Sequence, residues 1–248
     1  MIRAVLWDVD GTLLDFLAAE RAAVRTGFAR HGLGECTDEM LRVYSRINVK
    51  YWEALERGEM TKPEILTGRF REFFSLYGID PALADVFNAQ YQVDLGDTVV
   101  FQPGALETVQ ALRGRIPQYA VTNGTKIAQR RKLARSGLDT LLDGVFISED
   151  LGVEKPSPGF FDRVFAVLGD IPREETLIVG DSLTSDIRGG INAGIRTAWY
   201  NPEGKPLPAG WRVDHDLRSV AEVPAILQAA AMFPRRKDTL TAKNSRMA

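Results

Sequence analysis

Two aspartates near the start of the sequence have the residue type and spacing for catalysis. Asp8 and Asp10 follow the apolar run Ile2 to Trp7, which is long enough for one buried strand, and Gly11 comes directly after them. Residues i and i+2 of an extended chain point to the same side, and a glycine lets the chain turn sharply behind them. One carboxylate of such a pair can attack a substrate while the other handles a proton.

Two structural explanations account for less of the aspartate pair than a catalytic role does. A calcium loop of the EF-hand type needs glycine at its sixth position and glutamate at its twelfth, where this chain has Leu13 and Ala19. An Asx turn explains Asp10 and Gly11 but gives no role to Asp8, at the end of a buried strand. Ligands of open α/β sheets bind outside the carboxyl ends of strands, so the position favours a catalytic pair.

Polar residues also follow two later apolar runs. Thr122 and Asn123 end a run that begins at Tyr119, where a hydroxyl and nearby amides can meet an anion, although Asn-Gly is also a common turn. Lys155 lies in a later loop that Pro156 stiffens, so its side chain can be aimed, whereas most loop lysines are simply solvated. Both segments are candidates for substrate binding.

A second acidic motif lies late in the chain. Asp181 follows the apolar run Leu177 to Gly180, and Asp186 lies five residues further on, in the first turn of the next predicted helix. A helix cap would explain Asp186 but gives no reason for an acid at the tip of a strand. The motif therefore adds two candidate metal-binding carboxylates to the aspartate pair.

The elements that position these residues alternate between strands and helices. From Thr98 onward, apolar runs of strand length are separated by stretches of helical periodicity, which predicts an α/β fold with a doubly wound parallel sheet. The first strand needs neighbours on both sides, so it joins the later ones. The predicted later strands cover residues 98–101, 119–123, 145–148, 177–181 and 197–200.

The stretch between the first strand and the rest reads as helical throughout. Helix-start signals at Thr37, Thr61 and Pro81 divide it, after a first helix from Phe16, into four helices without a strand signal. An inserted all-helical cap domain follows from this pattern. The predicted organisation is a core of residues 1–15 and 98–233, a helical cap of residues 16–97 and a disordered tail of residues 234–248.

Composition limits the possible partners and the compartment. The 248 residues are 45% hydrophobic, and 31 basic against 33 acidic residues give a net charge of -2, so we expect neither a nucleic-acid polymer nor a membrane as partner. One cysteine, Cys36, excludes an internal disulfide and a thiolate zinc site. Asp8 interrupts the amino-terminal apolar run before a signal sequence could form, so we expect a cytoplasmic protein.

The four polar motifs together resemble the haloacid dehalogenase (HAD) superfamily, whose motifs occur in this order. They are the Asp8 to Asp10 pair, Thr122 after the second strand, Lys155, and the Asp181 to Asp186 motif. The helical block between the first two motifs resembles the C1-type cap of that superfamily. The resemblance spans the core and implies a Rossmann-like fold and an enzyme.

The resemblance also implies a role for each acid. Asp8 matches the nucleophile that becomes an aspartyl phosphate, and Asp10 matches the acid that protonates the leaving oxygen and then activates water. Mg²⁺ is the implied cofactor, with Asp8, the backbone carbonyl of Asp10 and Asp181 as ligands and Asp186 in its outer shell. Thr122 and Lys155 match the groups that bind phosphoryl oxygens. Such cations are needed because a carboxylate and a phosphate repel each other.

The presence of Asp10 indicates which reaction to expect. The halide-displacing members of the superfamily lack an acid at this position, because halide leaves unprotonated, whereas an alkoxide leaving a phosphate needs a proton. Phosphoryl transfer from a small phosphorylated metabolite is therefore the predicted chemistry.

A closer resemblance is to the pyrimidine 5′-nucleotidase branch of the superfamily. It implies a pyrimidine nucleoside 5′-monophosphate as substrate. The segments that carry it are Ile47-Asn48 with Trp52, Leu55, Gly58 and Thr61, then Gly68-Arg69-Phe70, Ile147 to Asp150 and Gly189 to Gly194.

Asn48 and Trp52 are the cap residues that this closer resemblance makes candidates for substrate binding. They lie one helical turn apart and could offer an amide and a stacking ring to a pyrimidine, although a buried helix would also place them together. Two other functions stay open: a sugar-phosphate phosphatase or phosphomutase, and a phosphate-accepting receiver module, which needs no helical cap. The oligomeric state is not predicted.

Overall fold

The centre of the molecule is a six-stranded parallel sheet. The computed structural model describes residues 1–232, with strand order β3-β2-β1-β4-β5-β6. Because β1 lies between β2 and β4, the direction of winding reverses beside it. The strands are β1 (Ala4–Trp7), β2 (Gln118–Thr122), β3 (Gly144–Ile147), β4 (Thr176–Gly180), β5 (Arg196–Tyr200) and β6 (His215–Leu217).

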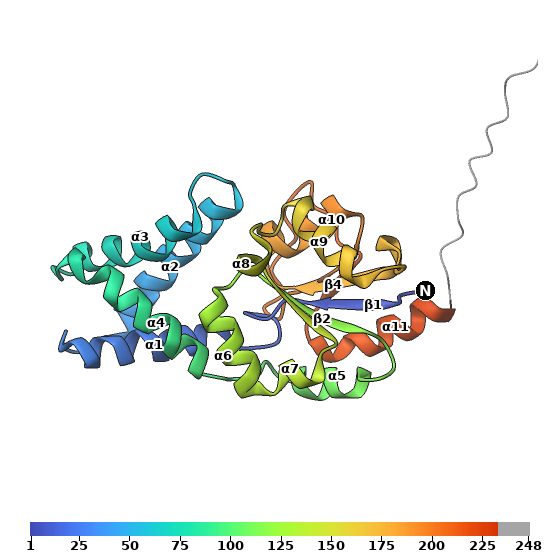
Figure 1. Cartoon of the computed structure of the whole chain (residues 1–248), viewed down its shortest axis with the longest axis horizontal. Coiled ribbons are helices and arrows are strands. Elements are labelled where there is room, and N and C mark those ends of the chain that lie inside the picture. The colour runs from blue at the N-terminus through green and yellow to red at the C-terminus, as the bar shows by residue number, and fades with distance from the viewer. Residues whose placement is uncertain (233–248) are drawn as a thin grey trace, which may run out of the picture.

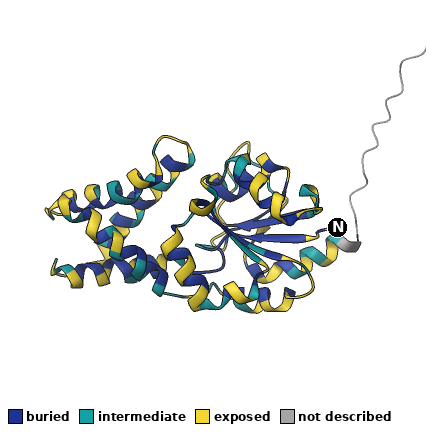
Figure 2. Cartoon of the chain, in the orientation of Figure 1, coloured by how far each residue is buried: buried dark blue, intermediate teal, exposed yellow. Residues whose placement is uncertain are grey.

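The central strands β1 and β4 are buried along their whole length because helices cover both faces of the sheet (Figure 1). Val5 and Trp7 pack into one cluster with helix α5 (Ala105–Leu112), whereas Leu6 packs on the other side with α9 (Pro158–Leu168). Figure 2 shows the strands as the most continuously buried part of the core. The remaining core helices are α6 (Lys126–Ser136), α7 (Leu138–Leu141), α8 (Ser148–Leu151), α10 (Arg188–Ala193) and α11 (Val223–Met232).

Residues 16–97 form a helical insertion between β1 and α5, on the left in Figure 1. Its aromatic side chains pack around Phe70, whose ring is stacked on that of Tyr44 and tilted against that of Phe87, with the ring centroids 4.9 Å apart in each pair. Helix starts follow the capping signals of the sequence, since Asp15, Thr37 and Thr61 are the N-caps. The insertion consists of α1 (Phe16–His31), α2 (Asp38–Glu56), α3 (Lys62–Leu76), the short turn η1 (Pro81–Leu83) and α4 (Ala84–Asp97).

The insertion is joined to the core at two adjacent crossings and along one helix. Leu14 and Phe101 form an antiparallel bridge, so the chain leaves and re-enters the core side by side. Helix α4 packs on α6 at Gly96, where a Cβ atom would lie 2.9 Å from the carbonyl oxygen of Ala128. Asp97 then pairs with Arg131 at 2.7 Å. The insertion is therefore anchored at its α4 end.

The parallel doubly wound fold predicted from the sequence is confirmed, and the differences lie at its edges. The predicted strand 98–101 is wrong, because only Phe101 makes a bridge. Strand β6 was not predicted, because three residues with a histidine and an aspartate lack a strand pattern. The predicted tail 234–248 falls outside the described residues. Within residues 1–232, no helix has the length and apolar character of a membrane span.

Candidate active site

The site lies at the carboxyl edge of the sheet, where β1, β2 and β4 end. Asp8 follows β1, Thr122 is the last residue of β2, and Asp181 follows β4. These residues line a pocket of about 560 Å³ that the helical insertion closes from the other side. Because β1 marks the reversal of winding, the pocket occupies the position where open α/β sheets bind ligands.

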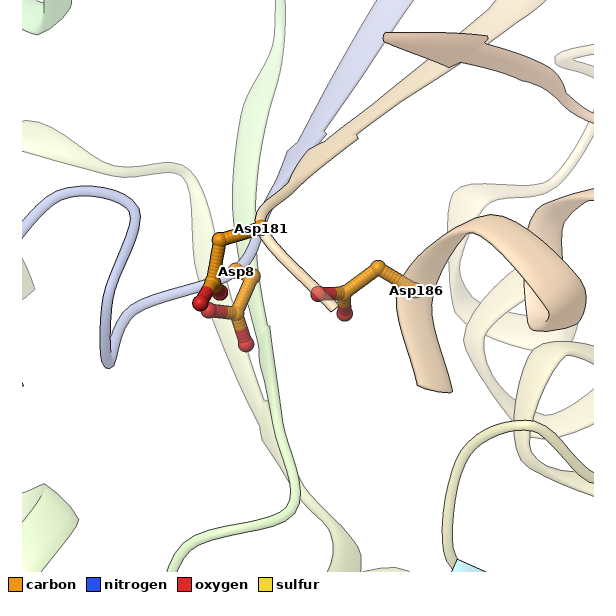
Figure 3. Close-up of side chains that lie close together, drawn as sticks. All are labelled: Asp8, Asp181 and Asp186. Carbon is orange, nitrogen blue, oxygen red and sulfur yellow. The ribbon is translucent and has the colours of Figure 1, made fainter. Parts of the chain in front are cut away.

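Three carboxylates converge in this pocket. One oxygen from each of Asp8, Asp181 and Asp186 lies within 4.8 Å of the others. Figure 3 shows Asp8 and Asp181 close together, with Asp186 reaching toward them from the helical turn η3 (Leu183–Ile187). Burial and the nearby Asp186 raise the pKa of Asp8 well above its ordinary value and that of Asp181 to about 7. The cluster therefore has an excess of negative charge.

Lys155 is the buried cation beside these acids. Its Nζ donates hydrogen bonds to Asp8 Oδ1 at 2.9 Å, Asp186 Oδ1 at 2.6 Å and the Val121 carbonyl oxygen at 2.7 Å. Burial lowers the pKa of Lys155, but Asp186 and Asp8 outweigh burial and raise it, so the ammonium stays charged. One ammonium cannot neutralise three carboxylates, which leaves the cluster able to take a cation.

Two glycines make room for the acids. Gly11 has φ +95°, and a Cβ there would lie 2.5 Å from Asp181 Oδ2. Gly180, at the end of β4, packs against the carboxyl group of Asp186 in the same way. The glycine after the first aspartate pair thus serves both the turn and the approach of a carboxylate from another strand.

The acids fit the preference of Mg²⁺ for oxygen ligands. Asp8 Oδ2 is buried and has no hydrogen-bond partner among residues 1–232, so it could bind a cation. Asp181 Oδ1 accepts a hydrogen bond of 3.3 Å from Thr12. Both oxygens of Asp186 are engaged, by Lys155 and by the Ser182 amide at 3.1 Å. Asp8 and Asp181 are therefore better placed as direct ligands than Asp186.

Asp10 is held from α6 by two residues that the sequence motifs did not indicate. Gln129 Nε2 donates to Asp10 Oδ2 at 2.5 Å, and Lys132 Nζ forms an ion pair with Asp10 Oδ1. Both side chains are buried, with 0% exposure for Gln129 and 1% for Lys132. A glutamine and a lysine on the buried face of a predicted helix are the signal that could have found them.

Thr122 and Asn123 both line the pocket, but their side chains are bonded within the protein. Thr122 Oγ1 accepts a hydrogen bond of 3.0 Å from the Gly124 amide. Asn123 Nδ2 donates to the Lys155 carbonyl oxygen, and Asn123 Oδ1 accepts from the Lys155 amide, both at 2.8 Å. Asn123 therefore ties the loop after β2 to the Lys155 loop, a role that differs from the predicted substrate contact.

Asn48 and Trp52 also line the pocket, with different surroundings. Asn48 is buried; its Nδ2 donates to Glu20 at 2.7 Å and its Oδ1 accepts from Arg69 at 2.6 Å. Its amide is thus hydrogen-bonded at both ends within the protein, and a contact with a pyrimidine stays a prediction. Trp52 lies outside the apolar cluster formed by the described residues of the insertion; it lines the pocket, and the Nζ of Lys62 lies over its ring, 6.0 Å from the centroid.

Two further residues at the boundary between insertion and core were missed. Glu56 Oε2, at the end of α2, accepts a hydrogen bond of 2.5 Å from Thr184 Oγ1, and burial raises the pKa of Glu56 to about 7. Lys62, at the start of α3, contacts the loop after β2. Neither belongs to a motif, because the contacts form between segments far apart in the sequence.

The fold and site define a Rossmann-like α/β enzyme with an acidic, lysine-bearing site at its strand ends and a helical insertion after the first strand. A family model described as haloacid dehalogenase-like hydrolase matches residues 2–194. The chain belongs to this family of hydrolases, which confirms the resemblance of the four motifs and the prediction of an enzyme.

Three relatives are similar over most of their lengths. The HAD hydrolase YfnB of Bacillus subtilis is 36% identical over 91% of this chain and 95% of its own. Two pyrimidine 5′-nucleotidases follow: PynA of Streptococcus pneumoniae, 37% identical over 80% of this chain and 83% of its own, and YjjG of Escherichia coli, 30% identical over 90% and 96%.

The solved structure of YfnB has the same fold. It superposes with a TM-score of 0.86 over 91% of this chain and 98% of its own. That crystal structure contains magnesium and is described as revealing interdomain movement.

Proposed function

We propose that this protein is a Mg²⁺-dependent phosphomonoesterase that forms an aspartyl phosphate on Asp8, with a pyrimidine nucleoside 5′-monophosphate as substrate. The observation that carries the proposal is the position of Asp8, whose Oδ1 contacts Lys155 while its Oδ2 has no hydrogen-bond partner. The nucleotidases PynA and YjjG support the substrate class, and the magnesium in YfnB supports the cofactor.

The first step is attack of an Asp8 carboxylate oxygen on phosphorus. Asp10 donates a proton to the ester oxygen as its bond to phosphorus breaks, so the product leaves as an alcohol. Thr122 and the ammonium of Lys155 bind the phosphoryl oxygens. Asp8, Asp181 and the carbonyl of Asp10 would hold Mg²⁺, with Asp186 behind them, and the ion when bound neutralises charge on the phosphoryl group.

The second step is hydrolysis of the aspartyl phosphate. Asp10, now a carboxylate, takes a proton from the water that attacks phosphorus, and the bond to the Asp8 oxygen breaks to release phosphate. Gln129 and Lys132 hold the Asp10 carboxylate by both oxygens, as a base in this step must be held. Halide displacement would give Asp10 no role.

Substrate choice falls to the helical insertion, which acts as a cap. The core supplies the phosphate chemistry, and the pocket wall that meets the leaving group comes from α2, with Trp52 as its aromatic member. The cap excludes water from the aspartyl phosphate. The pocket of about 560 Å³ suits a single phosphorylated metabolite, and the one cysteine, unpaired and buried, suits an enzyme of the cytoplasm.

The Asp8→Asn variant tests the proposal. It keeps the size of the side chain but removes the nucleophile, so kcat for a phosphomonoester should fall by about 10⁴-fold or more while the fold is retained. Phosphate release in Mg²⁺ is the measurement, with circular dichroism to check folding. Asp162→Asn, which changes an exposed carboxylate paired with Arg173, is the matched control.

Chelation of the metal tests the proposed metal dependence independently. EDTA should abolish turnover by the wild type, and added Mg²⁺ should restore it. Near-normal activity of Asp8→Asn would refute the proposed nucleophile. Stable phosphorylation by acetyl phosphate, without turnover of any phosphomonoester, would instead favour a receiver module.

A further inference from the structure

Lys62 extends from the helical insertion into the core and ends among the loops of the active site. Its Nζ donates hydrogen bonds to the Asn123 carbonyl oxygen at 2.8 Å and to Ser148 Oγ at 2.7 Å, and Glu154 Oε1 lies 3.3 Å away. The side chain is only 8% exposed. One cap lysine thus contacts the loop after β2, the end of β3 and the residue before Lys155.

These contacts close a ring around the phosphate-binding loops. Lys62 binds the backbone of Asn123, whose side chain forms two hydrogen bonds of 2.8 Å with the backbone of Lys155. Lys155 follows Glu154 in the chain, and the carboxylate of Glu154 forms an ion pair with Lys62, which completes the ring. The ring fixes the two loops that carry Thr122 and the Lys155 ammonium relative to each other.

The local structure of α3 does not explain a lysine at this position. Lys62 is in the first turn, where the helix dipole disfavours a cation, and the helix start is already satisfied by the capping box of Thr61 and Glu64. Burial of an ammonium is also costly unless it is paired and hydrogen-bonded. The contacts across the boundary are therefore the reason for the lysine.

A second contact between insertion and core lies on the pocket side of α2. Glu56 accepts the hydrogen bond from Thr184, in the turn η3 that carries Asp186. Lys62 and Glu56 together reach the loops after β2, β3 and β4, whereas the crossings at Leu14 and Phe101 are covalent connections. Of these contacts, only those of Lys62 reach both phosphate-binding loops.

We propose that Lys62 is a positioning residue of the phosphate site: when the cap lies on the core, its ammonium clamps the Asn123 and Glu154 loops and thereby places Thr122 and Lys155. The inference rests on the proposed function for its effect on turnover. The clamp itself is a property of the two loops and can be measured without turnover.

The experiment compares Lys62→Met with Lys50→Met. Methionine keeps the length of the side chain and removes the charge. Lys50 is a matched control, because it lies in the same insertion and pairs with Glu72 on an exposed surface at 2.7 Å. Amide hydrogen exchange is followed in peptides covering residues 118–126 and 150–158, together with kcat and KM for 4-nitrophenyl phosphate in Mg²⁺.

Lys62→Met should speed exchange in both peptides and lower kcat/KM by about 10- to 100-fold, because small misplacements of binding groups are costly. Lys50→Met should match the wild type in both. Glu154→Gln, which keeps the size of the acceptor, should change both readouts in the same direction by less. The double variant should lose less than the sum of the single losses, since both changes break one ring.

The outcomes separate this inference from the proposed function. Unchanged exchange in Lys62→Met, or a lower melting temperature with unchanged kcat/KM, would overturn the positioning role and leave the phosphatase proposal standing. Faster exchange in a protein whose wild type hydrolyses no phosphomonoester would leave the clamp standing and remove the proposed function.

Discussion

The core and the helical insertion differ in how far their buried acidic groups are compensated by cations. The core gathers Asp8, Asp181 and Asp186 around one ammonium, and among the described residues one oxygen of Asp8 has no hydrogen-bond partner. In the insertion, Glu20 and Arg69 are linked through Asn48, whose Nδ2 donates to Glu20 and whose Oδ1 accepts from Arg69. The core site therefore holds more acids than cations, whereas the buried Glu20 of the insertion is matched by one buried cation, Arg69.

The difference indicates where chemistry and where recognition occur. An unmatched acidic cluster is unfavourable in the empty protein and becomes favourable once a divalent cation and a phosphate bind. A network of matched charges needs no ligand for its stability. Under the proposed function, the insertion would provide the surface that selects the substrate, and the core would provide the groups whose charges change during the reaction.

After loss of the nucleophile Asp8, the largest effect should follow removal of the proton carrier Asp10 from the core. Asp10→Asn should lower kcat for alkyl phosphates by about 10²- to 10⁴-fold, because the same side chain supplies and later accepts the proton. Steady-state and single-turnover rates are the measurement. For 4-nitrophenyl phosphate, whose leaving group needs little protonation, the first step should be affected less than the second.

The Asp10→Asn variant also tests how the metal is bound. Because the proposed ligand is the backbone carbonyl of Asp10, Mg²⁺ affinity should survive the substitution. Loss of Mg²⁺ binding along with the side chain would show that the carbonyl does not have this role.

A smaller effect is expected on the thermal stability of the protein when the Mg²⁺ concentration and the pH are changed. The pKa of Asp181 is raised from 3.8 to about 7 by burial and by Asp186, so the folded protein holds a proton that the unfolded chain releases. Stability without metal should therefore fall as pH rises from about 4 to about 7, and the buried Asp8 and Glu56 act in the same direction. Mg²⁺ replaces these protons.

The expected result is a rise in melting temperature on adding Mg²⁺ that is larger at pH 8 than at pH 5. At 100 times its Kd the ion adds about 2.7 kcal/mol to the free energy of unfolding. Thermal unfolding in EDTA and in Mg²⁺ measures the difference, and Asp181→Asn should remove most of it. An increment that is independent of pH would mean that the metal binds elsewhere.

The sequence predicted the residues at the strand ends better than the contacts between distant segments, for a physical reason. Parallel strands place their carboxyl ends at one edge, so Asp8, Thr122 and Asp181 could be brought together from local patterns alone. Gln129 and Lys132 lie 119 and 122 residues from Asp10 in the chain, so polar residues on a buried helix face could mark them as unusual but could not name Asp10 as their partner. Lys62 follows the helix-start signal at Thr61, and its partners lie beyond the insertion, so no local pattern connects it to the site.

The two asparagines show the same limit in finer detail. Asn48 and Asn123 both line the pocket, as substrate-binding residues would, but their amides are bonded to Glu20 and Arg69 and to the backbone of Lys155. Helical spacing and strand position can bring a side chain to a pocket. They do not reveal which neighbour takes its hydrogen bonds.

The smallest predicted effect separates substrates by means of the insertion. If the ring of Trp52 stacks on a pyrimidine, Trp52→Ala should lower kcat/KM for pyrimidine nucleoside monophosphates by about tenfold, since stacking on an aromatic side chain contributes about 1–3 kcal/mol per base. The same change should leave sugar phosphates and phosphoserine nearly unaffected, because they have no ring to stack. Phosphate release is measured across the three substrate groups.

Trp211→Ala is the matched control. The ring centroid of Trp211 lies 4.2 Å from the guanidinium carbon of Arg188, and Trp211 is not among the described residues that line the pocket. It should change no substrate selectively. A wild-type enzyme that prefers sugar phosphates would remove the nucleotidase assignment while the phosphatase chemistry of the core stands. If pyrimidine nucleotides are preferred but Trp52→Ala lowers every substrate equally, Trp52 supports the wall of the pocket, and the discrimination then has to come from the polar groups around it.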